Sequence, residues 1–326
     1  MILKKRFSPC KKEVENETQK WYSIDNFIRK YNYQGVFFMK VGLSSYSLSR
    51  AISKGDLGIL EAIDWVANEG GEHIEVVPGF SWDIHVGNMP EKIAARAKEA
   101  GIDLSSYTIG ANFIQPDAAA LAKEVERIKG EVDIAARLGV KLMRYDAGWR
   151  PIPETTLENF EKDLPVVADA CREVASYAAQ YGITCSVENH GYHFQGCERV
   201  RRLVNAVGLP NYKTTLDVGN FLCADDDPVA AVKTNIDIAS MIHFKDFFRR
   251  PINRAPNGAG WFRTKGGHYL RGTIIGQGDV DLETIVGIIK ESGYNGYISV
   301  EFEGQEDCIY GCKVSLANAK RFFAEN

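Results

Sequence analysis

The sequence predicts an α/β protein that folds as a single (β/α)8 TIM barrel with an N-terminal extension. From Met39 onward, short apolar runs alternate with amphipathic segments, which is the pattern of strands followed by helices. Eight units of this kind fit one closed parallel barrel. In addition, four of the apolar runs end in a carboxylate or a histidine, and such barrels carry their chemistry at the C-terminal strand ends.

The expected strands are short apolar runs at 41–47, 72–77, 103–109, 140–145, 183–188, 212–217, 240–245 and 296–301. An open, doubly wound sheet is the alternative arrangement of the same alternation. The chain contains neither GxGxxG nor GxxxxGK[ST], so the nucleotide-binding versions of that sheet have no support. The closed barrel is therefore the preferred interpretation.

The expected helices are amphipathic segments at 56–68, 90–100, 117–138, 156–181, 198–207, 228–239, 281–292 and 314–324. Pro90 stands at a helix-opening position, where its missing N–H costs nothing. A glycine follows several of these segments, where a left-handed C-cap is wanted, at Gly101, Gly139, Gly182 and Gly293.

Two segments depart from the alternation. Residues 1–38 are rich in Lys, Asn and aromatic residues without a clean period, so we expect an extension there and a catalytic barrel domain over 39–326. Residues 249–272, after the seventh strand, form an unusually long Gly- and Arg-rich connection. Long loops in compact domains are often lids, so it is predicted to hang over the barrel mouth; the alternative is a contact in a homo-oligomer.

Composition narrows the class of protein. The chain has 326 residues, of which 45% are hydrophobic and 25% charged, as in an ordinary globular protein. A net charge of −4 gives no bias toward nucleic acid. No apolar run approaches the roughly 20 residues of a membrane span, and the start lacks the apolar stretch of a secretory signal. We therefore expect a cytoplasmic protein that binds neither nucleic acid nor membrane.

The seven cysteines are scattered and show neither a zinc CxxC pair nor a disulfide framework. Ordinary reduced thiols, as in a reducing cytoplasm, are the simplest interpretation. Cys308 and Cys312 stand four residues apart, and for this pair a redox or metal role is the alternative.

The strand-end residues Glu188, Asp217, His243 and Glu301 form a candidate metal site. Carboxylate oxygens and an imidazole suit one divalent ion such as Mn²⁺, Mg²⁺, Co²⁺ or Zn²⁺. Charges at the ends of apolar strands are costly to bury without partners, and a shared metal would supply them. For any one residue alone, a carboxylate exposed to water is the alternative.

The motifs SVENHG, TLDVGNF, IHFKD, GQGDVDL and SVEFEG resemble the sugar phosphate isomerase/epimerase superfamily of xylose-isomerase-like TIM barrels. The resemblance implies that Glu188, Asp217, His243 and Glu301 bind one divalent metal. It also implies that Glu188 and Glu301 are catalytic, one removing a carbon-bound proton and the other returning one. Asn220 stands where epimerases of the family often have a histidine, which counts against the epimerase assignment.

The expected function is that of a metal-dependent isomerase or epimerase of a small sugar or related hydroxy-carbonyl compound, acting through a metal-stabilised enediolate. The alternatives are a dehydratase or lyase on a keto-inositol-like substrate, and a metal-dependent sugar-binding protein without turnover. Candidate substrate-binding residues, each near a predicted strand end, are Glu75, His190, Lys245 and Arg249. The expected partner is thus a small sugar or polyol-derived molecule.

Overall fold

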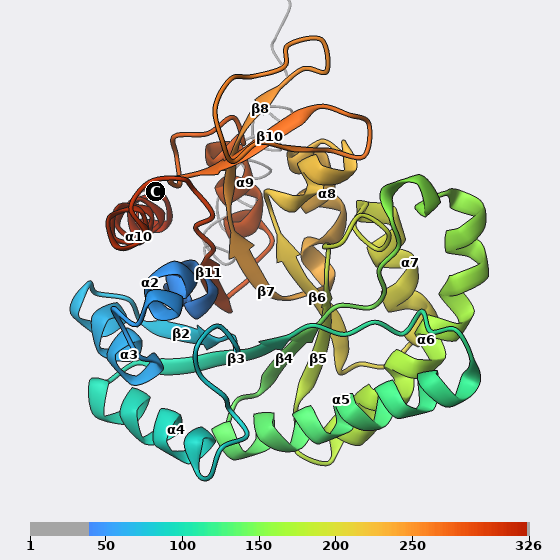
Figure 1. Cartoon of the computed structure of the whole chain (residues 1–326), viewed down its shortest axis with the longest axis horizontal. Helices are drawn as coiled ribbons and strands as arrows, with labels where there is room; N and C mark the ends of the chain where they lie inside the picture. Colours follow the sequence, from blue (N-terminus) through green and yellow to red (C-terminus); the bar gives the residue numbers. More distant parts are fainter. Residues whose placement is uncertain (1–38, 325–326) are drawn as a thin grey trace, which may run out of the picture. The chain divides into compact units, whose positions relative to one another are not determined.

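The structure is a computed structural model that describes residues 39–324; the expected extension, 1–38, lies outside the described residues. Eight parallel strands close into a barrel (Figure 1), which confirms the predicted fold class. The strands are β1 (Lys40–Ser44), β2 (His73–Val76), β3 (Asp103–Ile109), β4 (Leu142–Tyr145), β5 (Thr184–Glu188), β6 (Tyr212–Asp217), β7 (Ala239–Phe244) and β11 (Tyr297–Val300).

Strand β1 closes the barrel, because it pairs in parallel with β11 on one side and β2 on the other. The register also aligns the strand ends. Asp217 on β6 lies opposite His243 on β7, and His243 in turn lies opposite Ser299 on β11. Side chains alternate along a strand, so residues in this register point to the same interior level.

The helices surround the barrel (Figure 1) and bury their apolar faces against the outer side of the strands. They are α2 (Ser49–Lys54), α3 (Ile59–Asn68), α4 (Met89–Ala100), α5 (Ala118–Leu138), α6 (Leu157–Ala179), α7 (Cys197–Val207), α8 (Pro228–Asn235), α9 (Leu282–Glu291) and α10 (Cys308–Ala324). Helix α10 begins six residues before its predicted start, at Cys308. No helix within residues 39–324 is long and apolar enough to cross a membrane.

Local sequence accounts for several helix ends. Side-chain oxygens accept hydrogen bonds from the first turns of α5, α6, α8 and α9, as N-caps do. Gly101 and Gly139 end α4 and α5 with φ of 73° and 77°, a left-handed conformation that glycine adopts without a steric penalty.

The long connection after β7 is not the irregular loop that the sequence predicts. It folds into a three-stranded antiparallel sheet in the order β8 (Asp246–Arg250), β10 (Tyr269–Thr273) and β9 (Phe262–Arg263). Arg250 and Arg271 lie over the rings of Phe248 and Trp261, at 5.0–5.9 Å from the ring centroids. These stacked contacts and the strand pairing stabilise an ordered structure in this segment, which its high Gly content does not predict.

Asp246 ties this sheet to the chain that leads into α9. Its carboxylate accepts hydrogen bonds from the backbone N–H groups of Phe247, Gly276, Gly278 and Val280, at 2.8–3.3 Å. A Cβ on Gly278 would lie 2.6 Å from the Phe247 carbonyl oxygen and closer still to the Asp246 carboxylate. The GQGDV motif therefore wraps around one buried carboxylate and has no room for a side chain at Gly278.

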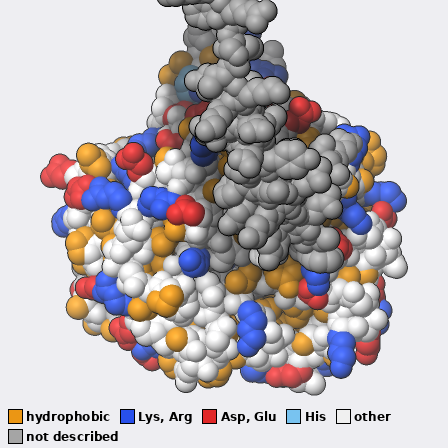
Figure 2. All heavy atoms as spheres, turned by 180° about the vertical axis from the view of Figure 1, so that it is seen from behind, with side chains coloured by type: hydrophobic (Ala, Val, Ile, Leu, Met, Phe, Trp, Pro, Cys, Tyr) orange, Lys and Arg blue, Asp and Glu red, His pale blue; other side chains and the backbone are white. Residues whose placement is uncertain are grey.

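Charges of both signs are interspersed over the part of the face in Figure 2 that the described residues form. This distribution differs from the basic stripe by which nucleic-acid-binding surfaces are recognised.

Candidate metal centre and active-site pocket

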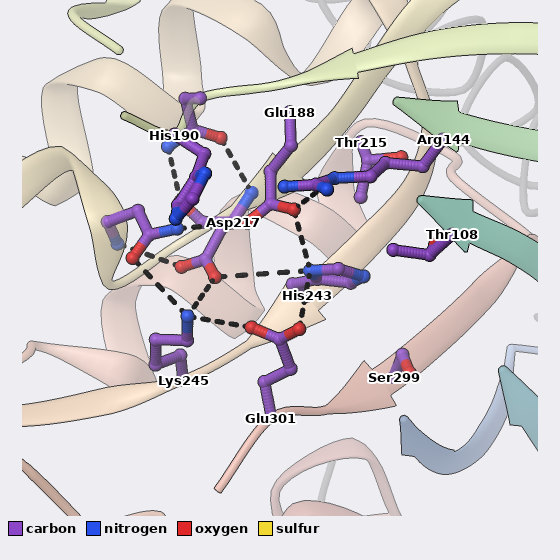
Figure 3. A network of polar contacts seen from close by, with 12 residues as sticks. Thr108, Arg144, Glu188, His190, Thr215, Asp217, His243, Lys245, Ser299 and Glu301 are labelled. Carbon is purple, nitrogen blue, oxygen red and sulfur yellow. Dashed lines mark hydrogen bonds and ion pairs between the residues drawn. The ribbon is translucent and has the colours of Figure 1, made fainter. Parts of the chain in front are cut away.

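Four buried side chains converge at the C-terminal end of the barrel (Figure 3). Glu188, Asp217 and His243 lie on β5, β6 and β7, and Glu301 directly follows β11. One ligand atom from each lies within 4.8 Å of the ligand atoms of the other three. The structure thus brings together all four residues of the predicted metal site, in a cluster small enough to surround one ion.

The orientation of His243 leaves one ring nitrogen facing the carboxylates. Its Nδ1 lies 3.5 Å from Glu188 Oε2, 3.5 Å from Glu301 Oε1 and 4.0 Å from Asp217 Oδ2. Within the described part of the chain, His243 Nδ1 is buried without a hydrogen-bond partner, and Asp217 Oδ2 faces the Lys245 ammonium at 3.1 Å. Buried polar atoms are normally satisfied, and a divalent cation among these oxygen and imidazole donors would give His243 Nδ1 a partner.

Glu75 on β2 holds the other side of the His243 ring. Its carboxylate lies 3.0 Å from His243 Nε2 and also accepts hydrogen bonds from Thr108 Oγ1 and, at 3.1 Å, from Ser299 Oγ. Carboxylates in this position orient the histidine ligands of metal ions. Glu75 is fully buried beneath His243 and is not on the pocket wall, so the structure does not place it where the predicted substrate contact requires.

Two neighbouring residues hold Glu188 in place, and the sequence did not predict either of them as its partner. Arg144 Nε lies 2.6 Å from Glu188 Oε2, and Asn220 Nδ2 donates to Oε1 at 2.9 Å. Burial alone would raise the pKa of the Glu188 carboxyl, but the charges of Arg144 and His243 outweigh it and hold this pKa well below its ordinary value. The sequence could have indicated Arg144, because it is another charged residue near the end of an apolar strand.

Lys245 and Glu301 form a second buried pair beside the cluster. Lys245 Nζ lies 2.7 Å from Glu301 Oε2, 3.1 Å from Asp217 Oδ2 and 3.3 Å from Glu303 Oε1. Burial raises the pKa of Glu301 to about 7, although the positive charges of Lys245 and His243 oppose the shift. The two glutamates at the cluster therefore have different proton affinities.

A pocket of about 350 Å³ opens above these residues. Its lining includes Glu188, Lys245, Glu301 and His190, and His190 Nδ1 lies 3.0 Å from Asp146 Oδ1. Burial tends to lower the pKa of His190, but the hydrogen bond and charge of Asp146 raise it overall. The sequence did not single out several other lining residues, namely Tyr46, Arg127, Glu131, Arg144 and Glu303.

Arg249 and the inserted sheet lie outside this pocket. Arg249 lines a separate surface hollow with Leu222, Pro228 and Asp279, and its backbone N–H donates to Asp279 Oδ2 at 2.6 Å. None of residues 249–272 is among the lining of the main pocket. The sheet contacts the loop between β5 and α7, where Tyr192 Oη donates to the Arg263 carbonyl at 2.8 Å. In the described conformation the segment borders the pocket at Tyr46 and Glu303 without lining it, and a lid over the barrel mouth stays a prediction.

Solved structures with the same fold include an L-ribulose 3-epimerase, with a TM-score of 0.67, 15% identity, and coverage of 88% of this chain and 95% of that one. The IOLI protein with a bound zinc atom has a TM-score of 0.66, 17% identity, and coverage of 88% and 98%. The probable 3-DHS dehydratase AsbF of Bacillus anthracis has a TM-score of 0.67, 14% identity, and coverage of 86% and 98%. At these identities the likeness supports the fold.

Sequence relatives point to the same group. The inosose dehydratase of Lactiplantibacillus plantarum is 26% identical over 254 residues, which cover 70% of this chain and 78% of the relative. The inosose dehydratase of Geobacillus kaustophilus is 26% identical over 226 residues, covering 66% and 72%. The family model for the xylose isomerase-like TIM barrel matches residues 63–319. The chain therefore belongs to the xylose isomerase-like TIM barrel family, as its strand-end motifs predicted.

Proposed function

We propose that this protein is a divalent-metal-dependent enzyme that removes a proton next to a carbonyl group of a small polyhydroxylated substrate. The observation that carries this proposal is the convergence of Glu188, Asp217, His243 and Glu301 beneath a pocket, with Lys245 beside them. The four side chains would hold the ion. A bound Mn²⁺, Mg²⁺, Co²⁺ or Zn²⁺ would supply Lewis-acid polarisation of the substrate carbonyl.

Glu301 is the residue that we assign as the general base. One of its oxygens faces the cluster, and the other lies 2.7 Å from Lys245 Nζ on the pocket floor. Lys245 stays next to the carboxylate and to the substrate oxygen that gains negative charge when the proton leaves. Its ammonium can stabilise that charge because a pocket shielded from water strengthens electrostatic contacts.

The contacts of Glu188 favour a dehydratase over an epimerase. Epimerisation needs a second group that returns a proton on the opposite face of the substrate. Both oxygens of Glu188 are already engaged, one by the Arg144 guanidinium and the other by the Asn220 amide. Such a carboxylate is a stable anionic ligand and a poor proton donor. We therefore assign Glu188 to metal binding and keep isomerase or epimerase activity as the alternative.

A dehydratase also needs an acid for the departing hydroxyl group. His190 is on the pocket wall, with Asp146 bonded to its Nδ1 and about half of its side chain exposed. We propose that His190 donates this proton and that the hydroxyl leaves as water. Two relatives named inosose dehydratases support a keto-inositol as the substrate class.

The remaining predicted substrate contacts divide in two. Lys245 and His190 keep that role in the proposal, since both line the pocket. Glu75 orients His243 instead, and Arg249 has no role in the proposed reaction, because it lines a different hollow.

The test uses protein stripped of metal by a chelator and reloaded separately with Mn²⁺, Mg²⁺, Co²⁺ or Zn²⁺. Each form is incubated in D₂O with an inosose and, in parallel, with a set of ketohexoses, and products are followed by NMR. We expect metal-dependent loss of the proton next to the carbonyl and release of water from the inosose. Binding without any exchange in all four metal forms would identify a sugar-binding protein and refute the proposal. Formation of an epimer without loss of water would establish the alternative.

A further inference from the structure

We propose that Cys308 and Cys312 form a redox-active dithiol, oxidised to an intramolecular disulfide by hydrogen peroxide, which controls the placement of Glu301. Formation of the disulfide does not depend on the proposed function. The expected effect of the disulfide on turnover does rest on the proposed function. Both thiols lie outside the pocket, at the N-terminus of α10 and behind the end of β11.

The two thiols share one backbone acceptor. Cys308 Sγ and Cys312 Sγ donate to the Ser47 carbonyl oxygen at 3.2 Å and 3.3 Å. Residues four apart in a helix have Cα atoms about 6 Å apart, which lies within the span that a disulfide can bridge. Their Cβ atoms lie about 5–6 Å apart, farther than the roughly 3.5–4.5 Å of a disulfide, so the backbone must move for the bond to form. Cys308 is the first residue of α10, so only the first turn must move to bring the sulfurs into bonding distance.

The two sulfurs differ in the way that an attacking and a resolving thiol differ. The Cys312 thiol, when it donates to the Cys308 sulfur instead of to Ser47, lowers the pKa of Cys308 to about 6, and Arg50 adds to the effect. Burial holds the pKa of Cys312 well above its ordinary value. Burial also raises the pKa of Cys171 and Cys185 to about 12. Cys308 is itself buried, with 7% of its surface exposed. It differs from the other thiols by its lower pKa, which favours the reactive thiolate form.

The reaction balances with hydrogen peroxide as the oxidant. The Cys308 thiolate attacks one oxygen, the O–O bond breaks, and a sulfenic acid forms at Cys308 while hydroxide leaves. Cys312 then attacks the Cys308 sulfur, so that the S–S bond forms and the second oxygen leaves as water. Two thiols and one peroxide give one disulfide and two waters. A dithiol reductant reverses the step by exchange.

The coupling to the active site runs through Ser47. Its hydroxyl donates to the Val300 carbonyl at 3.2 Å and accepts from the Phe302 N–H at 2.9 Å, so it holds the backbone on both sides of Glu301. A disulfide would remove both S–H donors from the Ser47 carbonyl and pull on the first turn of α10. We therefore expect Glu301 to shift while the barrel stays folded.

The test uses the full chain with Cys10→Ser, because Cys10 lies outside the described residues. The protein is treated with hydrogen peroxide, its free thiols are alkylated, and intact mass and peptide mapping are recorded. We expect the loss of two hydrogen atoms, a Cys308–Cys312 link, and reversal by dithiothreitol. Cys308→Ser and Cys312→Ser keep a donor for Ser47 and should abolish the link. Cys185→Ser, which removes a buried thiol elsewhere, should leave the link unchanged.

Alkylation of both Cys308 and Cys312 after peroxide treatment would overturn the proposal, and so would a link to another cysteine.

The effect of the disulfide on the active site is tested on metal-loaded protein by proton exchange and by the visible spectrum of the cobalt form, which reports the Glu301 ligand without a substrate. Displacement of a catalytic group by about 1 Å can cost about 10²-fold in rate, and we expect a reversible loss of that size. An unchanged spectrum in the disulfide form would refute the coupling. A spectral change without turnover in either form would instead count against the proposed reaction.

Discussion

Glu188 and Glu301 have the same side chain and face the same cluster, but their neighbours give them different chemistry. Glu188 forms an ion pair with Arg144 and accepts a hydrogen bond from Asn220, whereas Glu301 shares Lys245 with two other carboxylates. The first arrangement stabilises the anion, and the second allows a proton to be gained. A substitution that changes proton affinity but preserves shape should separate these roles.

We expect Glu301→Gln to keep the fold and most of the metal affinity but to lose turnover by about 10²–10⁴-fold, the usual contribution of a general acid–base group. The amide retains an oxygen toward the ion but cannot accept a proton at neutral pH. Glu188→Gln is the matched comparison and should chiefly weaken metal binding, since it removes the negative charge of a predicted ligand while Arg144 stays paired with Asp146. Metal content and kcat of both variants are measured. Near wild-type kcat in metal-loaded Glu301→Gln would leave Glu301 as a ligand only.

Glu75→Gln tests the residue beneath His243. Loss of the charge that orients the ring should lower metal affinity about 10–100-fold, as measured by titrating the metal-free protein with Co²⁺ or Zn²⁺. Glu124→Gln on α5 is the control, because Glu124 pairs with Arg127 and Asn112 and has no contact with the ligands. Equal affinities for Glu75→Gln and the control would show that Glu75 is only a packing residue.

At the scale of elements, the turn between β10 and α9 depends on the Asp246 carboxylate. Gly278→Ala would press a methyl group against that carboxylate and the Phe247 carbonyl. Overpacking of this kind typically costs about 1–3 kcal/mol, and we expect a loss of that size in the free energy of unfolding, measured with urea. Gly287→Ala on α9 is the control: its added Cβ meets no atom of residues 39–324 within 4 Å, so it should stabilise by about 0.5–1 kcal/mol. Equal effects of the two variants would contradict the tight turn.

The contact between β2 and β11 predicts a pH dependence of stability. His73 donates from Nε2 to the Ile298 carbonyl at 2.9 Å, and its Nδ1 has no hydrogen-bond partner in the described chain. Burial lowers the pKa of His73 from 6.5 to about 4. The neutral ring is favoured in the folded state, so the stabilising contribution is complete above pH 6.5 and is lost as the pH falls toward 4.

The expected loss is roughly 3 kcal/mol between pH 7 and pH 4. It is measured as the difference between wild type and His73→Gln in unfolding free energy at several pH values, because other groups that titrate cancel in this comparison. A glutamine retains a donor for Ile298 and does not titrate. Parallel pH profiles for the two proteins would show that His73 does not titrate on unfolding.

At the scale of the whole molecule, the barrel is closed by residues within the described range. Strand β1 begins at Lys40 and finds both of its partners in β2 and β11. We therefore predict that a protein lacking residues 1–38 folds cooperatively and binds metal as the full chain does. Urea unfolding followed by far-UV circular dichroism and by fluorescence checks this. Non-coincident transitions in the truncated protein alone would show that the extension belongs to the folding unit.

The sequence by itself determined the order of the eight barrel strands and of the helices from α3 to α10, and it placed the four cluster residues at strand ends. Both are local properties: alternation reveals the type of element, and a charge that ends an apolar strand is visible without a partner. Because parallel strands of a closed barrel share one C-terminal rim, the barrel prediction also implied that Glu188, Asp217, His243 and Glu301 converge.

Only the tertiary structure decided what each of these side chains contacts. Glu75 and His243 are distant in sequence, and their hydrogen bond exists because closure of the barrel brings β2 across the interior from β7. Arg249 comes soon after β7 in the sequence, which is why a substrate contact was predicted for it. Antiparallel pairing of β8 with β10 instead places Arg249 at a separate surface hollow. Such placements depend on contacts between distant segments, and the free energy of those contacts is absent from any local pattern.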